Sequence, residues 1–335
     1  MRFFEQQDAA RGETLRLLFL FALAVTATVI GVHLALVLCW GLLKLFSPFP
    51  LDFPRLFFTV NVGVTLLLVL GGWWIETSSL QMAGGAERLA RRVGAREARP
   101  ATSQAEQRLC NIVDEVCIAA NMPRPMVMVM PRHEAINAFA AGWDEDDAVV
   151  AVTQGALDLL TREELQGLVA HECSHIHEGD SRLNMQLAGM VSGLELVWGF
   201  GDVVRERGGV AVLFGNAIMA IGSVGWWAGR ALQASVARQR EFLADARAVQ
   251  WTRSRDGLGG VLRKAMTQKA QADRMRADPP WPVSVQHLLL LARLTERGGW
   301  FDAHPPLALR VQRLYGRPMP PLPLKETGAT EVTWV

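Results

Sequence analysis

Residues 161–177 read TREELQGLVAHECSHIH, and this stretch decides the fold of the region around it. Thr161, followed three residues later by Glu164, has the pattern of a capping box at a helix start. Apolar residues then recur at the three- and four-residue spacing of one helix face: Leu165, Leu168, Val169 and Ile176. The stretch therefore predicts a helix with one face buried in a core.

The same helix places two histidines on one side. His171 and His175 are four residues apart, so their side chains differ by about 40° around the helix axis and can grip one zinc ion. Glu172 lies about 100° from His171, within reach of a water on that zinc. Zinc lowers the pKa of such a water to about 7, and a carboxylate can take its proton during attack on a peptide carbonyl. The HExxH pattern favours a zinc peptidase over an ordinary amphipathic surface helix.

An open catalytic zinc site needs one more protein ligand. Residues 238–245 read RQREFLAD, which predicts a helix with Glu241 and Asp245 on one face. Glu241 is the candidate third ligand, and Asp245 would accept a hydrogen bond from the ring N–H of a ligand histidine. The alternative is an ion-paired couple of carboxylates on a solvated helix. We expect one Zn²⁺ per chain.

His177 is expected to lie outside this site, exposed to solvent, because it is about 200° around the helix from His175. Position 178 is Glu and position 181 is Ser, so the chain lacks the third histidine of a HExxHxxGxxH pattern. A set of two histidines and one glutamate is favoured.

Two long apolar segments precede this region. Residues 17–43 hold no Asp, Glu, Lys or Arg, and a helix of that length spans about 40 Å, enough to cross a hydrocarbon core of about 30 Å. Residues 56–75 form a second uncharged run, and the proline-rich residues 47–54 separate the two. A membrane-spanning hairpin is favoured over two buried helices of a soluble core, because soluble helices rarely stay apolar on every face for this length.

Basic residues indicate the orientation of this hairpin. Three arginines precede the first segment and five follow the second: Arg2, Arg11, Arg16, Arg88, Arg91, Arg92, Arg96 and Arg99. The loop between the segments holds only Lys44 and Arg55. The positive-inside rule then places the N-terminus and everything after residue 76 in the cytoplasm.

A second apolar pair lies between the two halves of the zinc site. Residues 208–229 are uncharged, whereas residues 183–201 contain Glu195 and give a weaker signal. The ligands on both sides must meet, so the chain between them crosses the membrane an even number of times. A second transmembrane hairpin at 183–229 is favoured, with a buried helical hairpin as the rival. An intramembrane Glu195 would need a partner or a wet cavity.

The remaining chain predicts a mostly helical α+β fold with a small β-sheet. A helix is expected over 104–121, followed by strands over 125–130, 136–141 and 148–153. The expected organisation is a transmembrane hairpin (1–76), a basic juxtamembrane linker (77–103), a metalloprotease domain (104–315) and a disordered proline-rich tail (316–335). The basic segment is expected to be a helix whose arginines meet anionic lipid, with a simple linker as the alternative.

Composition excludes one class of partner and bounds the compartment. The net charge is +1, which gives no case for nucleic acid. The four cysteines are too widely spaced for a disulfide scaffold and are expected to be buried thiols in a reducing compartment: Cys39, Cys110, Cys117 and Cys173.

Four motifs follow the first apolar hairpin in order: Asn137-Ala138-Phe139-Ala140, His171–His175, Glu241–Asp245 and His304-Pro305-Pro306-Leu307. Their order resembles the HtpX-like membrane metallopeptidases, relatives of the CAAX prenyl proteases. The resemblance implies a gluzincin-like domain on four transmembrane helices, facing the cytoplasm at a bacterial inner membrane, with a role in membrane-protein quality control. Cys173-Ser174 departs from the larger apolar residues that this family often has within the zinc motif.

The resemblance also implies roles for three further residues. Asn137 would lie on an edge strand that pairs with an extended substrate. His304 and Arg310 would lie near the cleft and hold substrate or the developing oxyanion. Without the resemblance, His304 followed by two prolines is simply a good helix start, and Arg310 could lie on the surface.

The leading hypothesis is a zinc-dependent endopeptidase that cleaves exposed or misfolded segments of membrane proteins. Its expected partners are protein or peptide substrates and the lipid bilayer. A narrow-specificity processing peptidase stays open. So does a proteolytically silent adaptor with a structural zinc, although such sites usually close with four protein ligands and no fourth is evident in the sequence.

Overall fold

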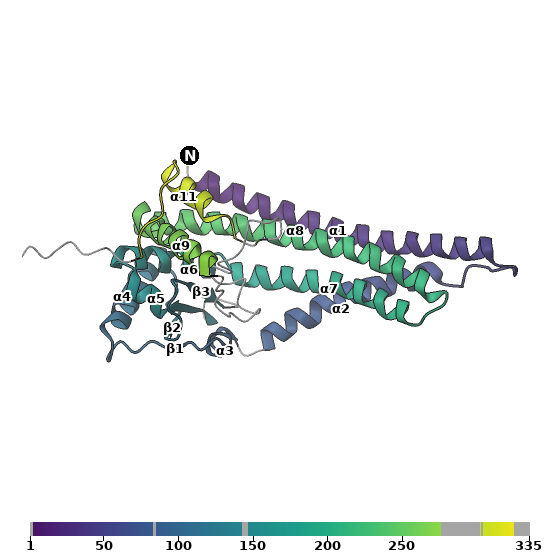
Figure 1. Cartoon of the computed structure of the whole chain (residues 1–335), viewed down its shortest axis with the longest axis horizontal. Coiled ribbons are helices and arrows are strands. Elements are labelled where there is room, and N and C mark those ends of the chain that lie inside the picture. The colour runs from purple at the N-terminus through teal and green to yellow at the C-terminus, as the bar shows by residue number, and fades with distance from the viewer. Residues whose placement is uncertain (1–2, 83–84, 143–146, 276–301, 303, 325–335) are drawn as a thin grey trace, which may run out of the picture. The chain divides into compact units, whose positions relative to one another are not determined.

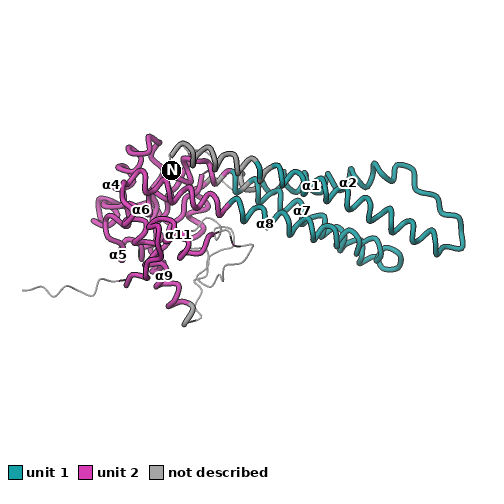
Figure 2. Tube along the Cα trace, turned by 90° about the horizontal axis from the view of Figure 1, so that it is seen from above, with its two compact units in different colours: residues 1–82, 183–236 teal, residues 83–182, 237–335 magenta. Residues whose placement is uncertain are grey.

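The computed structural model describes residues 3–82, 85–142, 147–275, 302 and 304–324 (Figure 1). The chain divides into two compact units (Figure 2). Unit 1 comprises residues 1–82 and 183–236, and unit 2 comprises residues 83–182 and 237–335. Helices predominate and one small mixed sheet is present, so the predicted fold class is confirmed.

Unit 1 is built from long apolar helices. They are α1 (Phe3–Phe46), α2 (Phe57–Met82), most of α7 (Asp180–Glu206) and the first part of α8 (Ala211–Thr252). Each contains a segment long and apolar enough to cross a membrane. The predicted four apolar segments are therefore all helical, including the weaker one, in which Glu195 lies on an exposed face of α7.

Glycines let the helices of unit 1 approach closely. A Cβ built on Gly193 of α7 would lie 2.2 Å from the carbonyl oxygen of Val69 on α2. A Cβ on Gly225 of α8 would lie 2.3 Å from Oγ1 of Thr28 on α1. Small residues at such contacts are typical of helices packed in a membrane, where van der Waals contact replaces the hydrophobic driving force.

Unit 2 holds the sheet and the shorter helices. Its elements are α3 (Gly85–Arg92), β1 (Arg96–Glu97), α4 (Gln104–Ala120), β2 (Met126–Met130), β3 (Ala138–Ala141), β4 (Val149–Thr153), α5 (Gln154–Leu159), α6 (Arg162–His177), the end of α8, α9 (Arg255–Met275) and α11 (Leu307–Tyr315). The three strands predicted from sequence lie within two residues of β2, β3 and β4.

The sheet is covered on both faces, which explains why its strands are apolar throughout. Its order is β1-β2-β4-β3, with β2 and β4 parallel and the other pairs antiparallel, so β3 is an edge strand. Met128 and Phe139 point to the face covered by α3, where they pack with Ala90. Val129 and Val150 point to the opposite face, where α4, α6 and α9 complete the main core.

One stretch agrees with the sequence prediction only in part, and another differs from it. Residues 77–103, expected to be a juxtamembrane helix or a simple linker, contain the helix α3 and also β1, a strand that was not predicted and that pairs with β2. The expected disorder from residue 316 is wrong for residues 317–324, which run along α9. There Arg263 Nε donates to the Pro320 carbonyl (2.7 Å) and Thr267 Oγ1 to the Leu322 carbonyl (2.6 Å). Met319 and Leu324 pack against the core, and residues 325–335 lie outside the described residues.

Candidate metal centre

Helix α6 is fixed at its start and along its length. Thr161 and Glu164 form the predicted capping box, and Glu164 also accepts a hydrogen bond from Lys264 Nζ of α9 (2.7 Å). A Cβ on Gly167 would lie 2.3 Å from the backbone nitrogen of Leu258, so α6 and α9 pack backbone to backbone. The helix that carries the two histidines therefore has little freedom to shift.

His171 and His175 face each other one turn apart on α6. Both side chains are largely buried, and their Nε2 atoms are 3.3 Å apart. Glu241 approaches from α8, with one carboxylate oxygen 3.6 Å from His171 Nε2 and the other 3.6 Å from His175 Nε2. The structure thus brings together the three candidate ligands, whose donor atoms lie within 4.8 Å of one another.

This donor set fits zinc. Ligand atoms about 2.0–2.1 Å from a tetrahedral zinc are about 3.3–3.4 Å from each other, close to the separations seen between the two histidines and Glu241. Two imidazole nitrogens and one carboxylate also form a donor set that leaves a fourth position for a substrate or water. The residues present therefore suit a catalytic zinc ion better than a closed structural one.

Carboxylates behind the histidines orient both rings. Asp245 Oδ1 lies 3.1 Å from His171 Nδ1, and Asp180 Oδ2 lies 2.8 Å from His175 Nδ1. With a proton on each Nδ1, both Nε2 lone pairs point toward the shared space. Asp180 was missed by the sequence reasoning. The sequence feature that could have indicated Asp180 is the preceding residue, Gly179. Its φ of 68° turns the chain after α6, so that the carboxylate of Asp180 reaches the ring of His175.

Electrostatics at the two histidines favour a cation. Burial lowers the pKa of His171, which keeps its ring neutral and able to act as a ligand. Burial also lowers the pKa of His175, but the hydrogen bond to Asp180 and the carboxylate of Glu241 outweigh it and raise that pKa to about 9. The anionic surroundings that hold a proton there would hold a divalent metal ion as well.

Arg310 is fully buried and is engaged by the carboxylates of the site. Its Nε and Nη2 donate to the two oxygens of Asp245 (2.9 and 2.6 Å), and its Nη1 lies 2.9 Å from Glu241 Oε2. The resemblance implies that Arg310 lies near the cleft, and in the structure its Nη2 also lies 3.4 Å from Nε2 of His171, a candidate ligand atom. His304 lies on the other oxygen of Glu241, with Nδ1 3.2 Å from Oε1.

Glu172 is the candidate base. Its side chain is only 1% exposed, and burial, reinforced by the Glu241 carboxylate, raises the pKa of Glu172 to about 8 against the opposing charges of His175 and Arg310. The backbone N–H of Ala140, on the edge strand β3, also opposes this rise in the pKa of Glu172. A carboxylate whose pKa lies near neutrality is suited to taking and returning a proton.

Asn137 and His177, which the sequence analysis also considered, are both at least partly buried. Asn137 immediately precedes β3 and is buried, with its backbone N–H donating to Thr153 Oγ1 (3.0 Å) and its side-chain oxygen accepting from the Ala138 N–H (3.0 Å). The prediction of a solvent-exposed His177 is wrong. Its ring is partly buried and lies edge-on to Trp251, with ring centroids 5.7 Å apart.

The model of a family described as Peptidase family M48 matches residues 103–317. Among curated relatives, a protein named Protease HtpX homolog from Ligilactobacillus salivarius is 35% identical over 229 residues, covering 64% of this chain and 74% of the relative. Its namesake from Listeria welshimeri is 30% identical over 283 residues, covering 75% of this chain and 86% of the relative. No solved structure matches the chain. The extent of the family match, which includes both halves of the candidate centre, shows that this chain belongs to peptidase family M48.

Proposed function

We propose that this membrane-anchored member of a metallopeptidase family is a zinc-dependent endopeptidase. The observation that carries the proposal is that His171, His175 and Glu241 meet beside Glu172. Glu172 is a buried carboxylate that is not one of the three candidate ligands, so it is available as a base. Zinc, when bound, supplies the Lewis acidity that activates water and polarises a peptide carbonyl.

The protein's own groups then perform the proton transfers. Glu172 takes a proton from the attacking water and passes it to the nitrogen of the leaving amine. His171 and His175 are held in the ligating orientation by Asp245 and Asp180. His304, beside Glu241, is the candidate for contact with the developing oxyanion.

For Arg310 we propose a positioning role in place of direct contact with substrate. A guanidinium that is fully buried and paired with Asp245 and Glu241 fixes the geometry of those two carboxylates. The proposed set is thus one base, Glu172, three ligands and three positioning groups, with His304 facing the reaction.

The substrate is proposed to be an extended protein segment. β3 is an edge strand, the backbone N–H of its residue Ala140 lowers the pKa of Glu172, and Asn137 immediately precedes it. An edge strand can add an extended peptide by backbone pairing, which would bring the scissile bond to the base. Together with four apolar helices, this supports membrane proteins as substrates and a role in their quality control.

We also propose that unit 2 faces the cytoplasm at a bacterial inner membrane. Arg88, Arg91 and Arg92 are exposed on α3, directly after the apolar helix α2. Such a basic cluster at the end of a span favours the cytoplasmic side.

The test is zinc content and casein cleavage by the detergent-purified chain. Glu172→Gln should keep zinc but lower cleavage by about 10²–10⁴-fold, the usual contribution of a general base. His171→Ala should lose both. Glu163→Gln, on the exposed side of the same helix, is the matched control and should keep both.

Each outcome has a distinct meaning. Full activity of Glu172→Gln would remove Glu172 as the base, and unchanged zinc affinity in Glu241→Gln would remove the third ligand. Zinc without cleavage of casein by the unaltered chain would favour a narrow processing peptidase or a silent adaptor. Absence of zinc would end the proposal.

A further inference from the structure

Gln268 lies on α9 and binds the backbone of the segment that leads into β3. Its side-chain Oε1 accepts a hydrogen bond from the Ile136 N–H (2.7 Å), and its Nε2 donates to the Ile136 carbonyl oxygen (3.3 Å). Both residues are buried, Gln268 at 8% exposure and Ile136 at 0%. A side-chain amide that offers one donor and one acceptor to the same residue pairs with it as a neighbouring strand would.

The neighbouring hydrogen bonds show which side of the strand Gln268 occupies. The Thr153 N–H donates to the Asn137 carbonyl oxygen (3.1 Å) and the Asn137 N–H donates to Thr153 Oγ1 (3.0 Å), so both backbone groups of Asn137 face β4. Backbone groups of successive residues in a strand alternate in direction, so those of Ile136 face the free edge of β3. By the same alternation, the backbone groups of Ala138 and Ala140 face this free edge.

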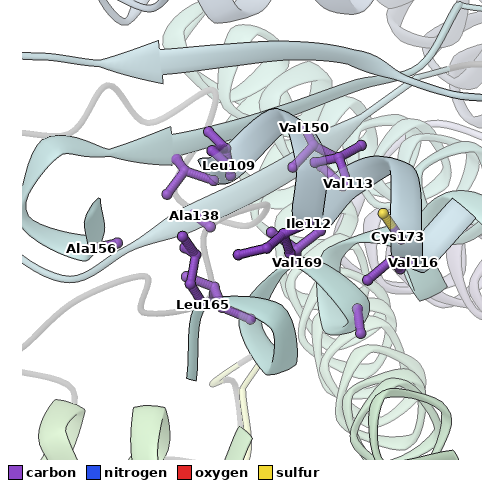
Figure 3. Packing of buried hydrophobic residues seen from close by; sticks show 14 of the residues in the cluster. Leu109, Ile112, Val113, Val116, Ala138, Val150, Ala156, Leu165, Val169 and Cys173 are labelled. Atoms are coloured by element: carbon purple, nitrogen blue, oxygen red, sulfur yellow. The ribbon is translucent and has the colours of Figure 1, made fainter. Parts of the chain in front are cut away.

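The edge strand packs on the helix that carries the candidate base. Ala138 and Ala140 are buried in the main core together with Leu165 and Val169 of α6, and Figure 3 shows Ala138 and Leu165 within this cluster. Glu172 lies seven residues, or about two turns, along the same helix from Leu165. A shift of β3 against α6 would therefore change where a peptide paired with β3 lies relative to Glu172.

We propose that Gln268 is a positioning residue for the substrate, which holds the start of β3 extended so that the free backbone groups of Ala138 and Ala140 are ready to pair with a peptide strand. Ile136 is then held by α9 from one side and Asn137 by β4 from the other. An edge that is already fixed loses less conformational entropy on binding than one that must first be ordered. The inference rests on the proposed peptidase function and on its edge-strand substrate.

A purely structural role is the contrasting explanation, in which Gln268 only satisfies the buried N–H and carbonyl of Ile136. The two roles differ in their kinetic effect. A loss of folded chain lowers the apparent kcat and the zinc content together and leaves KM unchanged. A loss of substrate positioning raises KM, because the pairing groups of the edge are less well ordered, and leaves the proton transfers by Glu172 in place.

The experiment measures steady-state cleavage by full chains in detergent micelles. The substrate is the shortest casein segment that the unaltered chain cleaves, found by mass spectrometry and synthesised with a fluorophore and a quencher. Gln268→Met is the test variant, because methionine has nearly the size of glutamine but cannot pair with both backbone groups of Ile136. Gln271→Met is the matched control, since Gln271 is exposed on the same helix.

Gln268→Met should raise KM on the order of tenfold, the effect of about one net hydrogen bond, with kcat within about twofold of the unaltered chain. Its zinc content should be unchanged, and Gln271→Met should match the unaltered chain in every respect. An unchanged KM would overturn the proposal. A fall in kcat and zinc content at constant KM would do so as well, and would assign Gln268 to folding alone.

Gln268→Ala provides the same comparison should Gln268→Met fail to fold. It removes the same pairing and leaves room for water to bind the freed groups of Ile136, which lowers the cost of the change to the fold. A raised KM at equal kcat supports the positioning role, and an equal KM overturns it. Failure of the proposed peptidase function would show separately, as absence of casein cleavage by the unaltered chain.

Discussion

The two units of this chain distribute apolar and charged side chains in opposite ways. Unit 1 exposes large apolar side chains such as Leu34 (59% exposed), Phe58 (63%) and Trp74 (67%). Unit 2 buries charged ones such as Arg310 (0% exposed) and Lys264 (5%). Each distribution would be costly for an ordinary soluble domain, because exposed apolar surface and buried charge are both unfavourable in water.

The difference shows that the unfavourable free energy of exposed apolar surface in unit 1 and that of buried charge in unit 2 are offset by different means. Exposed leucines and tryptophans on helices of membrane-spanning length are stable where lipid replaces water. Buried charges are tolerated where each finds an opposite charge, as Arg310 does with Asp245 and Glu241. The stability of unit 1 therefore depends on surrounding lipid, whereas the stability of unit 2 depends on every buried charge having an oppositely charged partner.

The largest effect is expected from breaking that network at Arg310. Arg310→Ala would leave Asp245 and Glu241 buried without their cation and should lower the free energy of unfolding of unit 2 by about 3–5 kcal/mol. Thermal unfolding in detergent micelles measures the change. Arg313→Ala is the matched control, because Arg313 is exposed on the same helix and only covers the Phe242 ring at 3.7 Å. Its cost should stay near 1 kcal/mol. Equal costs for the two variants would contradict the network.

Helix α6 could be predicted from the sequence because the residues that define it are close together in the chain. The capping pair, the apolar face and the four-residue histidine spacing all lie within residues 161–177. The same holds for Glu241 and Asp245, which share one helix turn, and for the four apolar segments, whose length alone identifies them. Regular spacing within one helix carries these predictions without knowledge of the fold.

The features that could not be predicted from the sequence depend on contacts between residues far apart in the chain. The hydrogen bonds of Arg310 to Asp245 join residues 65 apart in sequence, and no local pattern predicts them. The pairing of β1 with β2 and the binding of residues 317–324 to α9 have the same origin. Asp180 lies nearer, but its return to His175 requires the positive φ of Gly179.

A smaller effect is expected from introducing a charge into unit 1. Leu34→Asp places a carboxylate near the middle of the α1 span and should disfavour membrane insertion by about 2.5–3.5 kcal/mol. The fraction of chain that resists alkaline carbonate extraction from membranes measures this cost. Ile118→Asp is the control in unit 2, since Ile118 is 81% exposed on α4 and the change should alter stability by no more than about 0.5 kcal/mol. If both variants stayed in the membrane equally well, the interpretation of unit 1 as lipid-facing would fail.

A smaller effect is expected at Asp180, a buried acid that we propose orients the candidate ligand His175 without itself contacting a metal ion. Asp180→Asn should lower zinc affinity about 10–100-fold, because the ring of His175 loses its charged acceptor. Competition with a chelating dye measures the affinity. Asp158→Asn, at an exposed position on α5, should leave it unchanged. Unaltered affinity in Asp180→Asn would mean that Asp180 serves the fold of this turn and not the ligand.

The smallest effect, and one that depends on pH, is expected at Glu106. Hydrogen bonds from Arg96 (2.9 and 2.7 Å) and from the Arg99 N–H (2.6 Å) lower the pKa of this buried carboxylate. A lowered pKa in the folded state stabilises the fold above the ordinary pKa of Glu and loses that contribution as the pH falls through the folded value. Glu106→Gln should therefore cost about 1 kcal/mol near pH 7, since Arg96 is partly exposed. The difference from the unaltered chain should narrow below about pH 4.

Glu87→Gln is the control for Glu106→Gln within unit 2, because the ion pair of Glu87 with Arg91 is exposed. Its cost should stay below about 0.5 kcal/mol at either pH. Unfolding curves at pH 7 and in acid measure both variants. A cost for Glu106→Gln that did not change with pH would show that packing of the side chain, rather than its charge, stabilises this position.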